Sequence, residues 1–154
     1  GQAWGLYGFT ETYRETKDIR YLEMANKIAT YMLNHPNRTA DNIPYWDYNA
    51  PGIPNALRDV STGSIMASAL LELSTYNRQR SKEYFAAAAA ILKSLSSETY
   101  RSPIGENGGF LLKHGVGHLP ANSEVDVPLT YADYYYIEAL MRYKKLAEGK
   151  KLFD

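Results

Sequence analysis

Apolar residues recur at helical spacing through most of the chain and predict five helices. Spacings of three and four residues are typical of a helix that packs by one face. The expected ranges are 2–16, 18–34, 61–76, 82–98 and 129–147. Asp18 and Ser81 stand where the second and fourth helices begin, and such residues commonly cap a helix. Extended segments are few, with one short strand expected at FLLKH, so the fold class is all-α.

Two helical hairpins in the chain carry matching apolar positions. The second and fourth helices superpose at an offset of 63 residues, which pairs Leu22, Ala25, Ile28, Ala29 and Met32 with Phe85, Ala88, Ile91, Leu92 and Leu95. A third copy begins near Tyr134, where the pattern of residues 67–70 returns at 137–140. Hairpin repeats bury their apolar faces against neighbouring repeats. We therefore expect an arc of a toroid with inner and outer helices, whose earlier repeats precede Gly1; a freestanding five-helix bundle is the alternative.

Composition and charge narrow the function classes. A length of 154 residues suits one domain, 1–154. The 17 Lys and Arg balance the 17 Asp and Glu, so the chain has no net positive charge that would attract nucleic acid. No run of apolar residues is long enough to span a membrane. Cysteine is absent, which excludes disulfides and thiol catalysis. The chain contains 14 Tyr, 4 Phe and 2 Trp, which is more aromatic residues than a core requires. Clefts lined by aromatic residues commonly bind sugar rings.

Candidate binding residues gather before and at the start of the first and third helices. In a toroid, the N-terminal ends of the inner helices share one cleft. Gln2 can donate and accept hydrogen bonds beside the indole of Trp4, although a surface Gln on a packing helix fits equally well. Asp59 or Ser61 is expected to cap the third helix, a role that is compatible with sugar binding. Arg14, in the middle of the first helix, is expected at the surface.

Two long connections interrupt the helical pattern. The first contains four prolines and a Trp46 flanked by tyrosines, so Trp46 either stacks on a sugar or fixes the loop to the body. The second is glycine-rich and contains His114 and His118 four residues apart. Glycines between the two histidines disfavour a helix, so we expect no metal site there and treat His114 as a hydrogen-bonding group. Ser123 precedes the fifth helix, and with Glu124 and Asp126 it is expected to act as a cap.

Four segments together resemble a known family. They are GQAWGLYG, the PYWDYNAPG loop, the RDVSTGSIMASALLELS run that follows it, and GGFLLKHGVGHLPANSEVDVPLTYADYYYIEAL. In this order and spacing they resemble the C-terminal part of the unsaturated glucuronyl hydrolases, family 88 of the glycoside hydrolases. The resemblance covers essentially the whole chain. It implies an (α/α)6 toroid of six hairpins, of the six-hairpin glycosidase type with two long loops, and makes 1–154 the C-terminal portion of a larger catalytic domain.

The resemblance also implies a reaction. Family members remove a 4,5-unsaturated uronic acid from lyase-generated oligosaccharides, by an Asp that protonates the double bond and activates water, without a cofactor or metal. That Asp is expected before Gly1, so we assign no catalytic residue here and expect the isolated chain to be inactive. Gln2 matches a family residue that faces the uronate and the water. The expected substrate-binding residues are Gln2, Trp4, Trp46, Asp59, Ser61, His114 and Ser123.

Two alternatives to this function stay open. An unsaturated rhamnogalacturonyl hydrolase would share the toroid and the chemistry, and a non-catalytic helical-repeat module could bind carbohydrate with its aromatic face. The expected partners are an unsaturated oligosaccharide and, across the open edge of the arc, either a missing N-terminal segment or a second copy. We expect neither nucleic acid nor a membrane as partner, and a bacterial cytoplasm or periplasm fits the sequence equally well.

Overall fold

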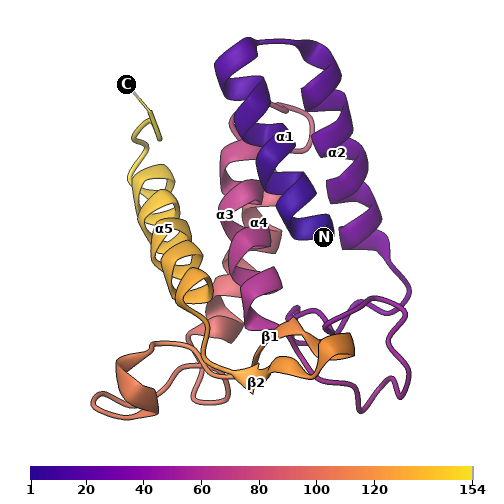
Figure 1. Cartoon of the computed structure of the whole chain (residues 1–154). Coiled ribbons are helices and arrows are strands. Elements are labelled where there is room, and N and C mark those ends of the chain that lie inside the picture. The colour runs from indigo at the N-terminus through magenta and orange to yellow at the C-terminus, as the bar shows by residue number, and fades with distance from the viewer. Residues whose placement is uncertain (154) are drawn as a thin grey trace.

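The computed structural model describes residues 1–153 of the chain, and its main elements are helices (Figure 1). The α-helices are α1 (Gln2–Thr16), α2 (Ile19–Asn34), α3 (Val60–Leu73), α4 (Ser81–Leu95) and α5 (Thr130–Ala147). A small hairpin is formed by β1 (Gly115–His118) and β2 (Ser123–Val127), with single 3-10 turns at Asn107–Gly109 and Leu119–Ala121. The prediction of an all-α fold made of helical hairpins is confirmed. Within residues 1–153, no helix has the length and apolar character needed to cross a membrane.

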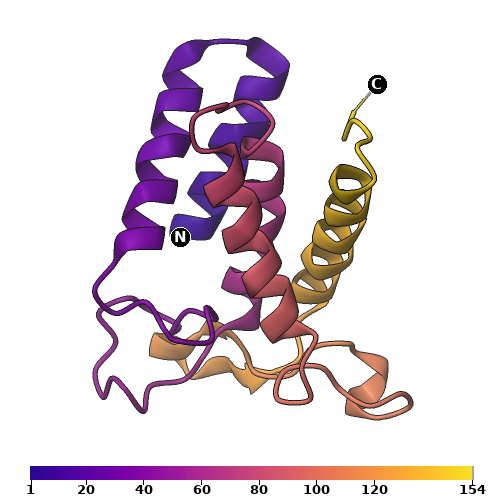
Figure 2. The ribbon, with the colours of Figure 1, turned by 180° about the vertical axis from the view of Figure 1, so that it is seen from behind.

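The helices form two layers. In Figure 1, α1, α3 and α5 all start near the β1–β2 hairpin and run away from it, while α2 returns beside α1. The view from behind in Figure 2 shows α4 returning across α3. Helix α3 packs between α1 and α5, and its outer side packs on α4. We therefore call α1, α3 and α5 the inner helices, as the toroid prediction requires.

The core is centred on α3, whose residues are buried along nearly its whole length. Small residues such as Ala67 and Ser68 are fully buried, which lets the neighbouring helices approach closely. Gly63 is part of this packing, because a Cβ there would lie 3.3 Å from the Ile43 side chain. The repeat predicted from the sequence fits this core: of the ten paired positions in α2 and α4, only Ile28 and Phe85 are half-buried rather than buried.

Two predicted helices end earlier than expected. The chain leaves α3 at Ser74, and the amide groups of Thr75 and Tyr76 then bond as turns to the carbonyls of Glu72 and Leu73. The hydroxyls of Ser74 and Thr75 also bond to carbonyls of the last helical turn. Hydroxyl side chains that compete for the backbone in this way favour the end of a helix. Helix α4 likewise ends at Leu95, before two serines.

The structure also tests the two predicted helix caps and the predicted strand. Asp18 caps α2 by accepting the amide of Arg20, as expected. The prediction for Ser81 is wrong: the N-cap of α4 is Arg80, whose amide donates to Asn77. The strand predicted at FLLKH is also wrong, because the amides of Leu111 and Leu112 donate to the carboxylate of Asp133 rather than to a strand.

The strand that does form lies just after FLLKH. Strand β1 pairs antiparallel with β2, with Gly115 opposite Val127 and His118 opposite Ser123. Glycine is favoured at position 117, because a Cβ there would lie 2.8 Å from the Cβ of Glu124. Ser123, Glu124 and Asp126 therefore belong to β2 and do not cap α5, whose N-cap is Leu129 without a side-chain bond. The capping prediction for these three residues is wrong.

Candidate functional site: the mouth of the inner helices

The N-terminal ends of the inner helices meet at one end of the molecule, which we call the mouth. In Figure 1 the start of α1, the start of α3 and the start of α5 all lie near the β1–β2 hairpin and the two long loops. This arrangement is the one predicted from the repeat. Helix α5 begins here at Leu129, which provides no side-chain cap.

Four aromatic side chains from α1 and α5 form an aromatic cluster at the mouth: Trp4, Tyr7, Tyr131 and Tyr135. The indole of Trp4 packs edge-on against Tyr135 with 5.2 Å between ring centroids, and lies 6.1 Å from Tyr131. Tyr7 packs edge-on against the same Tyr135 at 4.9 Å. Trp4 is 46% exposed, whereas Tyr7 is buried. The cluster therefore presents one ring to solvent and is supported from behind by the others.

Asp59 is a buried helix cap, as the sequence predicted. Its two carboxylate oxygens accept the amides of Ser61 and Thr62 and the hydroxyls of the same two residues. The amide of Val116 donates to it at 3.1 Å, which ties β1 to the start of α3. With five donors satisfied, Asp59 and Ser61 hold the mouth together, and both side chains are buried.

Tyr131 connects this cap to the aromatic cluster. Burial raises the pKa of the Tyr131 phenol, and the negative charges of Asp59 and Glu124 add to that rise, whereas the nearby Ser61 side chain lowers the pKa in part. The phenol therefore stays protonated and able to donate a hydrogen bond at neutral pH. Trp4 and the Asp59–Ser61 cap, which lie 55 positions apart in the sequence, thus share Tyr131 as a neighbour.

The remaining predicted residues lie around this centre with different partners. Gln2 is exposed in the first turn of α1. Trp46 is half-buried, and its backbone amide donates to the carbonyl of Leu57 within the same loop. Ser123 is exposed on β2.

His114 is paired with an acidic side chain. Its Nδ1 lies 2.7 Å from a carboxylate oxygen of Asp126, and its carbonyl accepts the amide of Val60 at the start of α3. His118 lies at the end of β1, opposite Ser123. Residues 1–153 contain no group of three or more His, Asp or Glu side chains positioned for a metal ion.

A buried ion network below the mouth was missed by the sequence analysis. Glu72 on α3 is 0% exposed and forms ion pairs of 3.0 Å with Arg14 of α1 and Arg142 of α5. Burial raises the pKa of Glu72, and the two guanidinium groups lower it again in part. The expectation that Arg14 is a solvated surface charge is therefore wrong: Arg14 helps to join all three inner helices.

A second carboxylate in this network lies closer to the aromatic cluster. Glu138 on α5 accepts the Tyr7 hydroxyl at 3.1 Å and the Ser68 hydroxyl, and lies 3.4 Å from Arg142. Ser68 and Glu138 are equivalent positions of neighbouring repeats at the offset of 70 residues, and so are Glu72 and Arg142. The repeat offset, applied to polar positions as well as apolar ones, could have found both pairs.

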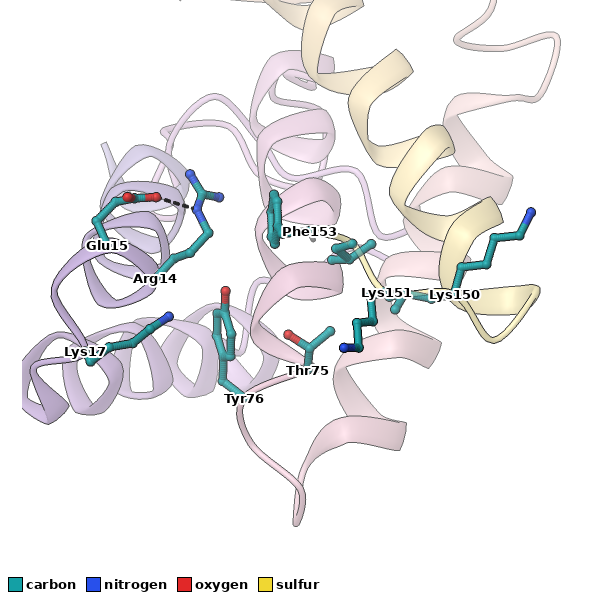
Figure 3. A pocket seen from close by; sticks show the side chains of 10 residues that line it. Arg14, Glu15, Lys17, Thr75, Tyr76, Lys150, Lys151 and Phe153 are labelled. Atoms are coloured by element: carbon teal, nitrogen blue, oxygen red, sulfur yellow. Dashed lines mark hydrogen bonds and ion pairs between the residues drawn. The ribbon is translucent and has the colours of Figure 1, made fainter.

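A cavity of about 670 Å³ lies at the opposite end of the inner helices (Figure 3). It is lined by Arg14, Glu15, Lys17, Thr75, Tyr76, Leu146, Lys150, Lys151, Leu152 and Phe153. Two of its cations are already matched, because Arg14 bonds to three carboxylates and Lys150 to Glu148. Figure 3 shows Lys150 pointing away from the other side chains. This cavity contains none of the predicted site residues, so the mouth remains the candidate site.

The hairpin repeats and their parallel inner helices define the chain as part of a helical toroid, and comparison with solved structures supports this class. A crystal structure of an unsaturated glucuronyl hydrolase specific for heparin superposes with a TM-score of 0.93 at 50% identity, covering 96% of this chain and 40% of that chain. An unsaturated glucuronyl hydrolase mutant of Streptococcus agalactiae, complexed with dGlcA-GalNAc6S, gives 0.85 at 32% identity, covering 94% of this chain and 39% of that chain. The predicted fold is confirmed.

The particular relatives carry the same name. An unsaturated glucuronyl hydrolase of Formosa agariphila is 43% identical over 146 residues, which is 95% of this chain and 36% of that protein. An unsaturated glucuronyl hydrolase of Bacillus sp. (strain GL1) is 32% identical over 152 residues, or 97% of this chain and 40% of that protein. No family model matches the chain. The chain is thus homologous to unsaturated glucuronyl hydrolases over less than half of their length, and the resemblance stated from the sequence is confirmed.

Proposed function

We propose that this chain is the C-terminal portion of a glycoside hydrolase that removes a 4,5-unsaturated uronic acid from lyase-generated oligosaccharides. The observation that carries the proposal is the 43% identity over 95% of the chain to an unsaturated glucuronyl hydrolase. The mouth supports it chemically. An exposed indole suits the apolar face of a sugar ring, and the N-terminal end of α5, which has no side-chain cap, suits a uronate carboxylate.

In this proposal the mouth binds and orients the sugar, and the proton donor comes from another part of the protein. Asp59 already accepts five hydrogen bonds at the mouth, which suits a cap better than an acid that must give up a proton. Gln2, in the first turn of α1, is free to orient the uronate or the attacking water. Trp4 supplies the stacking surface, while Trp46, His114 and Ser123 shape the surrounding loops.

The surface of α5 supports the existence of a larger domain. Tyr134, Ile137 and Met141 form an exposed apolar stripe beside a cavity of about 600 Å³. Solvated apolar surface of this kind usually marks an interaction site. In the proposed domain, helices from the rest of the toroid cover this stripe.

The proposal is tested in the full-length protein by following the ultraviolet absorbance of the sugar double bond. Full-length protein should consume an unsaturated uronyl disaccharide, and the 154-residue chain alone should not. Gln2→Ala should lower turnover by about 100- to 1,000-fold, as the loss of one preorganised hydrogen-bonding group does. Gln79→Ala, at an exposed Gln away from the mouth, is the matched control.

Three outcomes would contradict the proposal. Activity of the isolated chain would show that it contains its own acid. Normal turnover in Gln2→Ala, with lowered thermal stability, would make Gln2 a packing residue. Turnover of unsaturated rhamnogalacturonyl substrates alone would show that the protein is an unsaturated rhamnogalacturonyl hydrolase instead.

A further inference from the structure

The position of Glu138 links the buried ion network to the mouth. Its side chain is only 21% exposed and has contacts on all three inner helices: Tyr7 on α1, Ser68 on α3 and Arg142 on α5. A carboxylate has acceptor sites for several donors at once, so one group can fix three partners. Glu138 does not itself belong to the aromatic cluster.

Tyr7 is the residue through which Glu138 reaches the cluster. The Tyr7 hydroxyl donates to Glu138 at 3.1 Å, and the Arg142 guanidinium lies over the Tyr7 ring at 5.4 Å. The other edge of the ring packs on Tyr135, which in turn supports Trp4. Contacts therefore run without a break from Glu138 to the exposed indole. A side chain held at both its polar and its apolar end has little rotational freedom.

We propose that Glu138 is a positioning residue that, through Tyr7 and Tyr135, holds Trp4 in the orientation in which it stacks on the sugar. The expected effect of Glu138 on catalysis rests on the proposed function. Its effect on the orientation of Trp4 does not. Binding groups must be preorganised by the residues behind them if they are to use their full interaction energy. Glu138 supplies that support without touching the substrate.

The structural claim is tested in the 154-residue chain by the near-ultraviolet circular dichroism of Trp4. The background is Trp46→Phe, which leaves Trp4 as the one indole because the chain has 2 Trp. Tyr7→Phe removes only the hydroxyl that reaches Glu138, and Glu138→Ala removes the carboxylate itself. Both should weaken the indole band. Tyr13→Phe, on the same helix with its ring packed on Tyr76, should leave the band unchanged.

The functional claim is tested in the full-length protein with an unsaturated uronyl disaccharide. Tyr7→Phe and Glu138→Ala should raise KM by about 3- to 10-fold, the equivalent of one aromatic contact, with a smaller change in kcat. A merely structural Glu138 would lower the thermal midpoint and leave the indole band and KM unchanged, and that result would overturn the inference. If full-length protein has no activity on this substrate, the proposed function fails while the circular dichroism experiment still decides the inference.

Discussion

The inner helices α3 and α5 occupy equivalent places in the repeat, yet one is covered on every side and the other is not. Tyr134, Ile137 and Met141 on α5 are 61%, 42% and 60% exposed. Their equivalents on α3, at the offset of 70 residues, are Ser64, Ala67 and Leu71, all 0% exposed. Helix α3 has α1 and α5 on its two sides, whereas α5 packs mainly on α3 and meets α1 only through the aromatic cluster and the Tyr7–Glu138 hydrogen bond. Burial of these positions thus depends on the neighbouring helix, and the exposed apolar stripe on α5 is the surface that the proposed larger domain would cover.

The largest effect on stability is expected from removing the ion pairs by which α3 binds both α1 and α5. Glu72→Ala leaves Arg14 and Arg142 without their buried partner, so the free energy of unfolding should fall by about 3–5 kcal/mol. Urea denaturation of the chain measures this loss. Glu83→Ala, which breaks an exposed pair with Arg80 on α4, is the control and should change stability by less than about 1 kcal/mol. Equal effects of the two substitutions would mean that the buried network does not hold the inner helices together.

The second-largest effect is expected from the loss of a buried side chain on α3. Leu71→Ala deletes a fully buried side chain of α3, and we expect a loss of about 2–5 kcal/mol from the free energy of unfolding. The same denaturation measurement applies. A loss below about 1 kcal/mol would mean that α3 is less tightly packed than its burial indicates.

A smaller effect is expected at the mouth. Trp4→Ala removes a half-exposed indole, so it should cost about 1–2 kcal/mol, less than the 3–5 kcal/mol typical of a buried Trp. Thermal and urea unfolding with the remaining Trp46 as fluorescent probe give the value. A loss in the range of a buried Trp would show that Trp4 is part of the core and is not a surface presented to ligand.

The smallest effect is expected on the uncovered helix. Met141→Ala in the isolated chain should change the free energy of unfolding by less than about 0.5 kcal/mol, because the side chain is 60% exposed. In the full-length protein the same change should cost about 2–5 kcal/mol if a further helix covers α5. A large cost in the chain alone, together with a concentration-dependent mass by sedimentation, would identify a second copy as the covering partner. Equal small costs in both proteins would refute the covering of α5.

The sequence was sufficient for the parts of the fold that depend on local periodicity. Helix positions followed from apolar spacing, and the cap at Asp59 followed from residue type and place. The strand at Gly115–His118 was missed, because it depends on antiparallel pairing with Ser123–Val127, a contact between segments that local pattern cannot reveal. Ser81 failed as a cap because Arg80 bonds back to the preceding turn.

The position of the candidate site was predicted from the sequence, but the buried ion network behind it was not. The mouth and its residues Trp4, Asp59 and Ser61 followed from the direction of the helices. Glu72 and Arg142 were missed because a single charge within a helix has the same appearance in sequence whether it faces water or an opposite charge. The offset of 70 residues does align Glu72 with Arg142, but their contact depends on how the neighbouring helices pack, which is a property of the tertiary structure.

The two polar pairs between α3 and α5 also fix the helices against sliding along each other. Ser68 faces Glu138 and Glu72 faces Arg142, so both pairs join residues at the same height on parallel helices. A slip of four residues, about 6 Å along the helix, would bring Glu138 level with Glu72 and place two carboxylates side by side. The correct alignment is thus favoured by attraction and its nearest competitor is penalised by repulsion. Identical hairpins could stack in several alignments; this pair of charges selects one, and with it the level at which the helix ends meet.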